Sequence, residues 1–136
     1  MAKLTVEIVT PEKRILSVQA DEAIVPGSEG LFGVRPGHTP FLSLMDAGVL
    51  TLNGGEGGGV EPYFVAGGFV EVSNDKVLVL ADVAEPVSSI DAEAARRRAQ
   101  EATQRLKDIP ADDVRFNLEQ ATVRRELARV NAVTQR

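Results

Sequence analysis

Cysteine is absent from this chain of 136 residues, which excludes disulfides, thiol catalysis and thiolate metal sites. His38 is the only histidine, so no histidine cluster can ligate a metal or serve as a triad base. No pair of carboxylates is marked by its spacing for acid–base work. No apolar run approaches the roughly 18 residues that indicate a membrane span. We therefore expect no catalytic residues, no metal, no cofactor and no direct insertion into a membrane.

Charge is spread unevenly along the chain. Residues 1–86 hold 12 acidic and 5 basic side chains, whereas residues 87–136 hold 8 acidic and 10 basic ones. The first part therefore carries a net charge of −7 and the second part +2, which together give the −5 of the whole chain. This asymmetry predicts that the two parts meet different surfaces. An acidic first part argues against nucleic acid as a partner, because phosphates require a basic face.

Residues 1–86 show the pattern of many short strands. Leu4, Val6 and Ile8 alternate with other side chains at a period of two, as a half-buried strand does. Eight further apolar runs follow at short intervals up to residue 80, and Gly and Pro separate them. Strands this short and this close predict an antiparallel β-sandwich or barrel. Asn74 and Asp75 tolerate a positive φ, which predicts a hairpin turn between the last two of these runs.

Two glycine-rich segments invite a nucleotide-binding interpretation. Residues 54–59 contain five glycines, and residues 27–33 contain three. Neither segment has the Lys-Ser/Thr pair of a phosphate-binding loop, and no helix is predicted after either one. A hairpin loop is therefore the favoured interpretation of residues 54–59.

Residues 87–136 contain no glycine, and their pattern predicts a helical hairpin. Asp91 can cap a first helix, which has an apolar face of small residues and stops at Pro110. Asp112 or Asp113 can cap a second helix, which extends to about Val133. The second helix has two apolar faces, of which one can take the first helix and the other needs a further surface. Their members are Val114, Leu118, Ala121, Ala128 and Ala132 on one side and Phe116, Val123, Leu127 and Val130 on the other.

Arginines are frequent in this second part. Arg96, Arg97 and Arg98 are adjacent, so a helix spreads them around its circumference, and solvated side chains are the favoured interpretation over a basic patch. Arg125 and Arg129 lie one turn apart on the second helix, and Arg115 falls within about a right angle of them. A solvated flank and a binding surface explain these three equally well.

One segment, residues 26–42, combines four glycines and three prolines with strand-like residues at both ends. Such a turn-rich segment held between strands is a typical site for binding groups. Its most distinctive residues are Gly27-Ser28-Glu29-Gly30, Gly33-Val34 and Pro36-Gly37-His38-Thr39-Pro40. This run closely resembles the epsilon subunit of the bacterial F-type ATP synthase, and the resemblance extends over the whole chain.

The resemblance implies an α+β fold, with an N-terminal antiparallel β-sandwich (1–86) followed by a C-terminal antiparallel two-helix hairpin (87–136). It implies a non-catalytic rotor subunit of the central stalk, located peripherally on the cytoplasmic face of the bacterial inner membrane. The sandwich would join the gamma subunit to the c-subunit ring and so couple proton translocation to ATP synthesis. The hairpin would contact the alpha and beta catalytic subunits and restrain ATP hydrolysis.

The resemblance also implies residue roles. The c-ring and gamma contacts would be made by a loop with His38 nearby, comprising Gly27, Ser28, Glu29, Gly30 and Leu31. On the hairpin, Arg115, Arg125 and Arg129 would meet the beta or gamma subunit. Family members that bind ATP on the hairpin have an arginine where this chain has Ala94, so we expect weak or absent ATP binding. The alternative is a stand-alone module that senses a small ligand or nucleotide.

Overall fold

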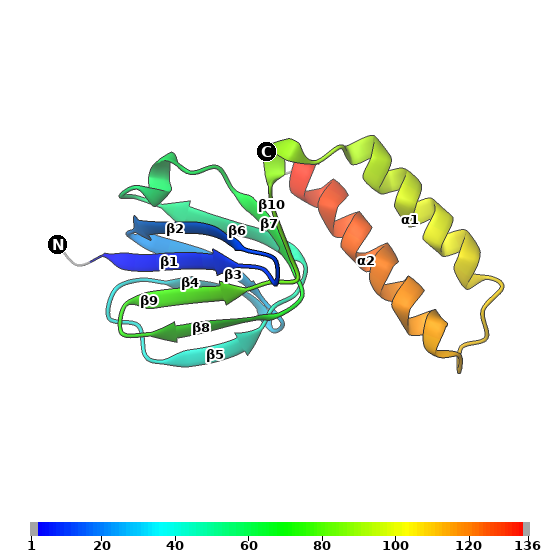
Figure 1. Ribbon diagram of the computed structural model, residues 1–136, viewed down its shortest axis with the longest axis horizontal. Coiled ribbons are helices and arrows are strands. Elements are labelled where there is room, and N and C mark those ends of the chain that lie inside the picture. Colours follow the sequence, from blue (N-terminus) through cyan, green and yellow to red (C-terminus); the bar gives the residue numbers. More distant parts are fainter. Residues whose placement is uncertain (1–2, 135–136) are drawn as a thin grey trace. The chain divides into compact units, whose positions relative to one another are not determined.

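The computed structural model describes residues 3–134. Its internal contacts divide the chain into two compact units, Met1–Val87 and Ser88–Arg136. The first unit contains every strand, and the second contains both α-helices (Figure 1). Each unit is described separately below.

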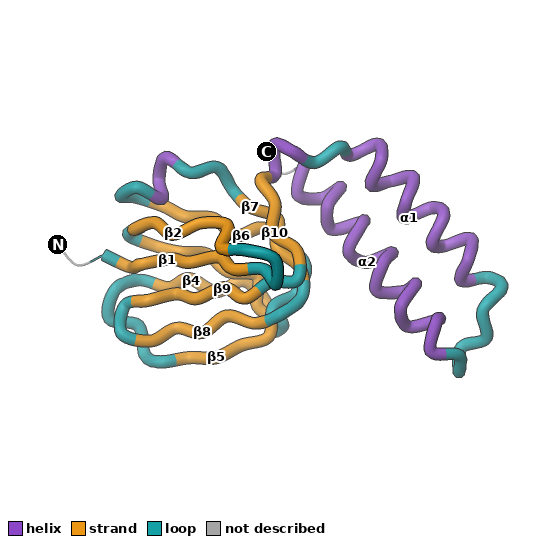
Figure 2. The backbone as a smooth tube through the Cα atoms, viewed as in Figure 1, coloured by secondary structure: helices purple, strands orange, loops and turns teal. Residues whose placement is uncertain are grey.

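The first unit is built from two five-stranded sheets, which are orange in Figure 2. One sheet has the spatial order β2-β1-β9-β8-β5. Its strands are β1 (Leu4–Val9), β2 (Arg14–Ala20), β5 (Phe41–Leu44), β8 (Phe69–Ser73) and β9 (Lys76–Leu80). The other sheet has the order β10-β7-β6-β3-β4. Its strands are β3 (Glu22–Gly27), β4 (Gly30–Val34), β6 (Gly48–Asn53), β7 (Tyr63–Ala66) and β10 (Val83–Pro86).

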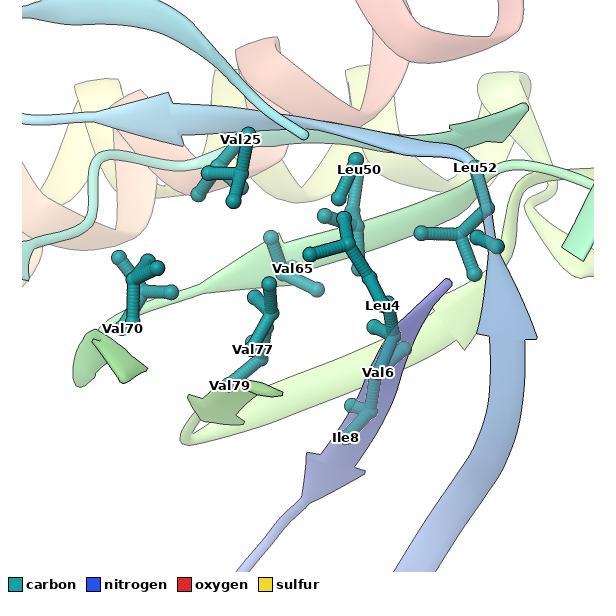
Figure 3. Close-up of a cluster of buried hydrophobic side chains, with 14 of the residues drawn as sticks. Leu4, Val6, Ile8, Val25, Leu50, Leu52, Val65, Val70, Val77 and Val79 are labelled. Carbon is teal, nitrogen blue, oxygen red and sulfur yellow. The ribbon is translucent and has the colours of Figure 1, made fainter. Parts of the chain in front are cut away.

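The two sheets enclose one hydrophobic core. Strand β1 alternates strictly between buried and half-buried residues, because successive side chains of a strand point to opposite faces. Leu4, Val6 and Ile8 are fully buried, and they meet Val65, Val77 and other valines from both sheets (Figure 3). The period-two pattern of the sequence is therefore the pattern of burial in the sandwich.

Most neighbouring strands pair in the antiparallel sense, and the β8–β9 connection is the turn predicted at Asn74 and Asp75. These two residues have φ values of 50° and 59°, which match the left-handed positions of a two-residue hairpin. The exception is β1, which pairs with β9 in the parallel sense over Thr5–Lys76 to Val9–Leu80. The sandwich fold is confirmed, with this one parallel pairing inside it.

One strand of the first unit was missed by the sequence pattern, whereas the predicted hairpin loop at residues 54–59 is present between the antiparallel strands β6 and β7. Strand β10 was not predicted, because it is four residues long and ends in Pro86; its pairing with β7 is a tertiary contact. Residues 54–59 connect β6 to β7 through a 3₁₀ turn, η1 (Gly57–Gly59). Gly57 is buried there, and a Cβ on it would lie 2.9 Å from the Cβ of Ala20. This segment is a tightly packed connection and does not form a phosphate-binding loop.

The second unit is the predicted two-helix hairpin. A 3₁₀ turn, η2 (Val87–Ser89), precedes α1 (Ala92–Leu106), and α2 is Val114–Thr134. The carboxylate of Asp91 caps α1 by accepting from the Ala94 amide at 3.1 Å. Asp113, rather than Asp112, caps α2, since its Oδ1 accepts from the Arg115 amide at 2.9 Å. The face of α1 that packs is formed by buried alanines: Ala95, Ala99 and Ala102.

Candidate functional site

The turn between β3 and β4 presents the first set of candidate residues. Gly27 pairs with Gly30, so Ser28 and Glu29 form the exposed tip of a tight hairpin. Gly30 has a φ of 123°, which a residue with a side chain rarely adopts. Gly27 is buried, and an added Cβ would lie 2.8 Å from the Phe32 ring. The Ser28 amide donates to the carbonyl of Leu44 at 2.9 Å, which fixes the tip against β5.

His38 lies in the loop beyond the other end of β4. Its amide donates to the Arg35 carbonyl at 3.1 Å, and its Nδ1 lies 2.6 Å from the Thr39 carbonyl oxygen. Its ring packs against Phe41 at a centroid distance of 6.2 Å. The Gly37 amide donates to Asp75 Oδ1 at 2.7 Å, which fastens this loop to the β8–β9 turn. His38 therefore has a structural environment, and its imidazole is only partly accessible.

His38 and the tip of the hairpin lie beyond opposite ends of β4, whose five residues span about 16 Å of extended chain. Aromatic rings connect the two regions. The Phe32 ring, which lies beside Gly27, packs on Phe41 at a centroid distance of 5.2 Å, and Phe41 packs on His38. A common binding surface of the tip and His38 stays a prediction.

The end of β4 near His38 is held by a polar cluster around Glu22. The Glu22 carboxylate accepts from Asn53 Nδ2 at 3.0 Å and from Arg35 Nε at 3.1 Å. The hydrogen bonds from Asn53 and Arg35, in that order, lower the pKa of the Glu22 carboxyl. Glu22 lies on β3, Asn53 lies on β6, and Arg35 directly follows β4. The cluster therefore fixes the position at which the loop that carries His38 begins.

A third feature is an apolar surface that sequence analysis did not single out. On the edge strand β5, Leu42 and Leu44 are 64% and 67% exposed, and on the adjacent β8, Phe69 is 37% exposed. Leu44 pairs with Phe69, and both leucines are on the outer face because the alternate residues of β8, Val70 and Val72, are buried. We call Leu42, Leu44 and Phe69 the apolar edge. The alternation of Leu42 and Leu44 around Ser43 was the available indication.

Leu31, a candidate contact residue beside the hairpin tip, belongs to a different face. It is 71% exposed and lies on β4, the edge strand of the other sheet, where it pairs with Pro26 of β3. An edge strand with exposed leucines is a liability for an isolated protein, because it offers unpaired backbone groups and apolar area to any other chain. Both sheets thus present apolar side chains at their β4 and β5 edges.

The three arginines of α2 have different environments. Arg115 forms a bidentate pair with Asp113, with Nη2 to Oδ2 at 2.7 Å, and this pair raises the pKa of the Arg115 guanidinium. Arg129 Nη1 contacts Glu126 Oε1 at 2.5 Å, and the Arg129 side chain is only 13% exposed. The buried Nε of Arg125 has no hydrogen-bond partner among residues 3–134. The three side chains therefore do not form one solvent-facing cluster.

The three adjacent arginines of α1 also diverge, as the helical period predicted. Arg96 pairs with Glu93 and Arg97 with Glu101, both within α1, whereas Arg98 reaches Glu126 on α2. Ala94 contributes only its backbone amide to the capped first turn, so its side chain offers nothing to a phosphate. No group of three or more His, Cys, Asp or Glu side chains within residues 3–134 is placed to hold a metal ion. No helix in that range is long and apolar enough to cross a membrane.

The fold thus defines a class, a β-sandwich with exposed strand edges joined to a helical hairpin. A family model described as "ATP synthase, Delta/Epsilon chain, beta-sandwich domain" matches residues 3–87. An ATP synthase epsilon chain of Myxococcus xanthus strain DK1622 is 75% identical over 132 residues, covering 97% of this chain and 96% of the relative. Its counterpart in Anaeromyxobacter dehalogenans strain 2CP-1 is 46% identical over 127 residues, covering 93% and 95%. The chain belongs to the family of ATP synthase epsilon chains.

Solved structures show the same fold at low sequence identity. A chain of the Euglena gracilis mitochondrial ATP synthase, described as OSCP/F1/c-ring, matches with a TM-score of 0.78 and 22% identity, covering 100% of this chain and 83% of that one. A chain of the Tetrahymena thermophila mitochondrial ATP synthase, described as central stalk/c-ring, matches with a TM-score of 0.68 and 14% identity, covering 98% and 96%. Both alignments include the sandwich and the hairpin together.

Proposed function

We propose that this chain is a non-catalytic rotor subunit in the central stalk of a proton-translocating ATP synthase. The observation that carries the proposal is the 75% identity to an ATP synthase epsilon chain over 97% of the chain. The solved chains of the same fold come from ATP synthase assemblies, one described as OSCP/F1/c-ring and the other as central stalk/c-ring. In this role the sandwich joins the gamma subunit to the c-subunit ring on the cytoplasmic face of the membrane. It transmits rotation and performs no chemistry.

The apolar edge is the surface that we assign to the gamma subunit. Leu42 and Leu44 expose apolar area on an edge strand. A stably bound partner would cover these side chains and would also pair with the free backbone groups of the strand. Each leucine that becomes buried contributes about 1.5–3 kcal/mol to association before the costs of binding are subtracted. A partner seated there would also reach the neighbouring half-buried residues of β9.

The test is the double substitution Leu42→Lys and Leu44→Lys, followed by measurement of binding to purified gamma subunit. We expect affinity to fall by at least tenfold while the sandwich stays folded, because both side chains already face solvent. The matched control is Val114→Lys with Leu118→Lys on α2, where the side chains are 72% and 65% exposed. Equal loss in both variants, or no loss in the first, would refute the assignment.

The hairpin tip is the surface that we assign to the c-subunit ring. Ser28 and Glu29 project beyond the last pair of the β3–β4 ladder, and Leu31 adds an exposed apolar side chain. Since the chain has no cysteine, Ser28→Cys or Leu31→Cys creates a unique thiol. In the assembled enzyme we expect a crosslink to the polar loop of a c subunit that carries a matching cysteine. Crosslinks confined to alpha or beta would contradict this orientation.

The hairpin is the part that we assign to the regulation of ATP hydrolysis through the alpha and beta subunits. Arg115 is the accessible member of the proposed arginine set, with a side chain 68% exposed. Arg129 pairs with Glu126 one turn away within α2, and its side chain is only 13% exposed. Opening the hairpin would make the Arg129 side chain accessible to another subunit and would leave its pair with Glu126 intact.

A further inference from the structure

The two helices of the hairpin are connected by two arginine–glutamate pairs of identical spacing. Arg98 Nε lies 3.1 Å from Glu126 Oε1, and Arg105 Nε lies 2.9 Å from Glu119 Oε1. Seven residues separate the two arginines in α1, and seven separate the two glutamates in α2. Because the helices are antiparallel, a single register satisfies both pairs. We call these two pairs the ion-pair ladder.

The glutamates of the ladder lie in the seam where the helices pack, and the arginines, whose side chains are 48% and 51% exposed, reach them from its rim. Glu126 is 2% exposed, and the Glu119 side chain is 23% exposed. A seven-residue repeat keeps side chains on the stripe of a helix that faces its partner. The ladder arginines therefore alternate with buried Ala95 and Ala102, and the ladder glutamates alternate with half-buried apolar residues: Phe116, Val123 and Val130.

Stability alone does not explain charges in this position. The second carboxylate oxygens of Glu119 and Glu126 are buried and have no hydrogen-bond partner within residues 3–134. An ion pair between a half-exposed arginine and a carboxylate that keeps one buried oxygen unsatisfied contributes little to stability. Buried polar residues in helical seams are best attested as devices that specify register.

The ladder discriminates sharply among the registers open to an alanine-lined seam. A slip of α2 by one helical turn would place the arginines opposite apolar residues and the glutamates opposite alanines. A slip by seven residues would keep one pair and leave one arginine and one glutamate without partners. Small alanine side chains alone would tolerate either slip, because they interlock weakly.

We propose that the ion-pair ladder sets the register of the hairpin and holds it closed, so that α1 accepts only a helix with two acidic side chains seven residues apart. Arg98 and Arg105 lose their partners when α2 leaves α1, whereas Glu126 keeps Arg129, its neighbour within α2. The closed state is therefore defined by charge pairing between the helices. This inference concerns the hairpin alone and stands apart from the assignment of the sandwich surfaces.

The test measures the distance between spin labels on the two helices of the full chain. Gln100→Cys and Asn131→Cys supply two exposed labelling positions in a chain without other thiols. Glu126→Gln should raise the ratio of open to closed hairpins roughly tenfold, because a hydrogen bond between charged groups is lost. Glu119→Gln should raise the same ratio about two- to fivefold, since its pair is more exposed.

Exchanging the charges of the more exposed pair, Arg105 and Glu119, makes the test specific. Arg105→Glu alone should open the hairpin, and adding Glu119→Arg should restore most of the closed population. The control is Glu93→Gln, which removes the pair with Arg96 within α1 and should leave the distances unchanged. Circular dichroism separates opening from loss of helix. The proposal fails if both glutamine variants stay closed, or if the exchange variant is as open as Arg105→Glu.

Discussion

At the scale of single residues, Gly68 has the strictest requirement in the sandwich. Its φ is 77°, and an added Cβ would lie 1.8 Å from the carbonyl oxygen of Leu80. A side chain would therefore strain the backbone and push apart two chain segments that meet at the start of β8. Relieving the strain or the overlap would require β9 to move, so only glycine fits at this position.

Gly68→Ala should lower the free energy of unfolding by at least about 2 kcal/mol, from the left-handed strain and the overlap together. Gly58→Ala is the matched control, because nothing lies within 4 Å of its added Cβ and its φ is not in the left-handed region. That control should change stability by less than about 0.5 kcal/mol. Chemical denaturation of the two variants gives both values, and similar losses would refute this account of Gly68.

Asp113 is the residue whose charge matters most to the start of α2. The side chain of Arg115, and then its backbone amide, lower the pKa of the Asp113 carboxyl to about 2, below the value of about 3.9 for an unfolded chain. A group with a depressed folded-state pKa contributes stability that is present above the unfolded value. That contribution is lost as the pH falls from about 4 through about 2.

Asp113→Ala should therefore lower the thermal midpoint of the hairpin at pH 6, and the difference from the parent should shrink toward pH 2. Asp112→Ala removes the adjacent carboxylate, which does not cap the helix, and should have little effect at either pH. Thermal melts followed by circular dichroism measure both. A difference that stays constant between pH 6 and pH 2 would mean that the Asp113 charge does not stabilise α2.

At the scale of elements, local patterns predicted most of the fold. Period-two alternation located the first strand, short apolar runs between Gly and Pro located eight more, and the capping residues Asp91 and Asp112 or Asp113 located both helix starts. Short elements whose existence depends on a distant partner were missed, as β10 was, because four residues ending in proline have no strand pattern of their own. The parallel pairing of β1 with β9 was missed for the same reason, since no local residue encodes it.

The candidate surfaces were only partly predictable. The tip at Ser28 and Glu29 followed from turn chemistry, whereas the contact of His38 with Phe41 depends on the tertiary fold. Neither predicted apolar face of α2 is buried as a unit: Val114 and Leu118 are exposed while Ala132 on their face is buried, and Leu127 on the other face is 49% exposed. Arg98 was interpreted as a solvated side chain, but it belongs to the ion-pair ladder. The matched seven-residue spacings of arginines and glutamates were visible in the sequence and could have revealed the ladder.

At the scale of the whole molecule, the division at Val87 and Ser88 separates two different kinds of packing. Every member of the main hydrophobic cluster lies between Leu4 and Ala84, so the sandwich needs no side chain of the hairpin for this core. The hairpin packs through alanines and ion pairs, which bury little apolar area per residue. The two units therefore differ in how much stability each can supply by itself.

Deleting residues 88–136 should leave a cooperatively folded sandwich that still binds gamma and supports coupled ATP synthesis. In the assembled enzyme the same deletion should raise ATP hydrolysis, because the regulatory helices are gone. Calorimetry of the truncated chain and hydrolysis assays of the complex test the two halves separately. Loss of folding would refute the independence of the sandwich, and unchanged hydrolysis in a normally assembled complex would refute the regulatory role of the hairpin.

The position of β1 has a consequence for how the chain folds during translation. This first strand lies between β2, its neighbour in sequence, and β9, which is completed only at Leu80. A nascent chain can form the β1–β2 hairpin early, but the other side of β1 stays unpaired until the residues of β9 have been translated. Contacts between such distant segments slow folding and leave the unpaired edge of β1 exposed until then. Pauses in translation between β2 and β9 would therefore prolong the interval in which the nascent chain can aggregate or bind a chaperone.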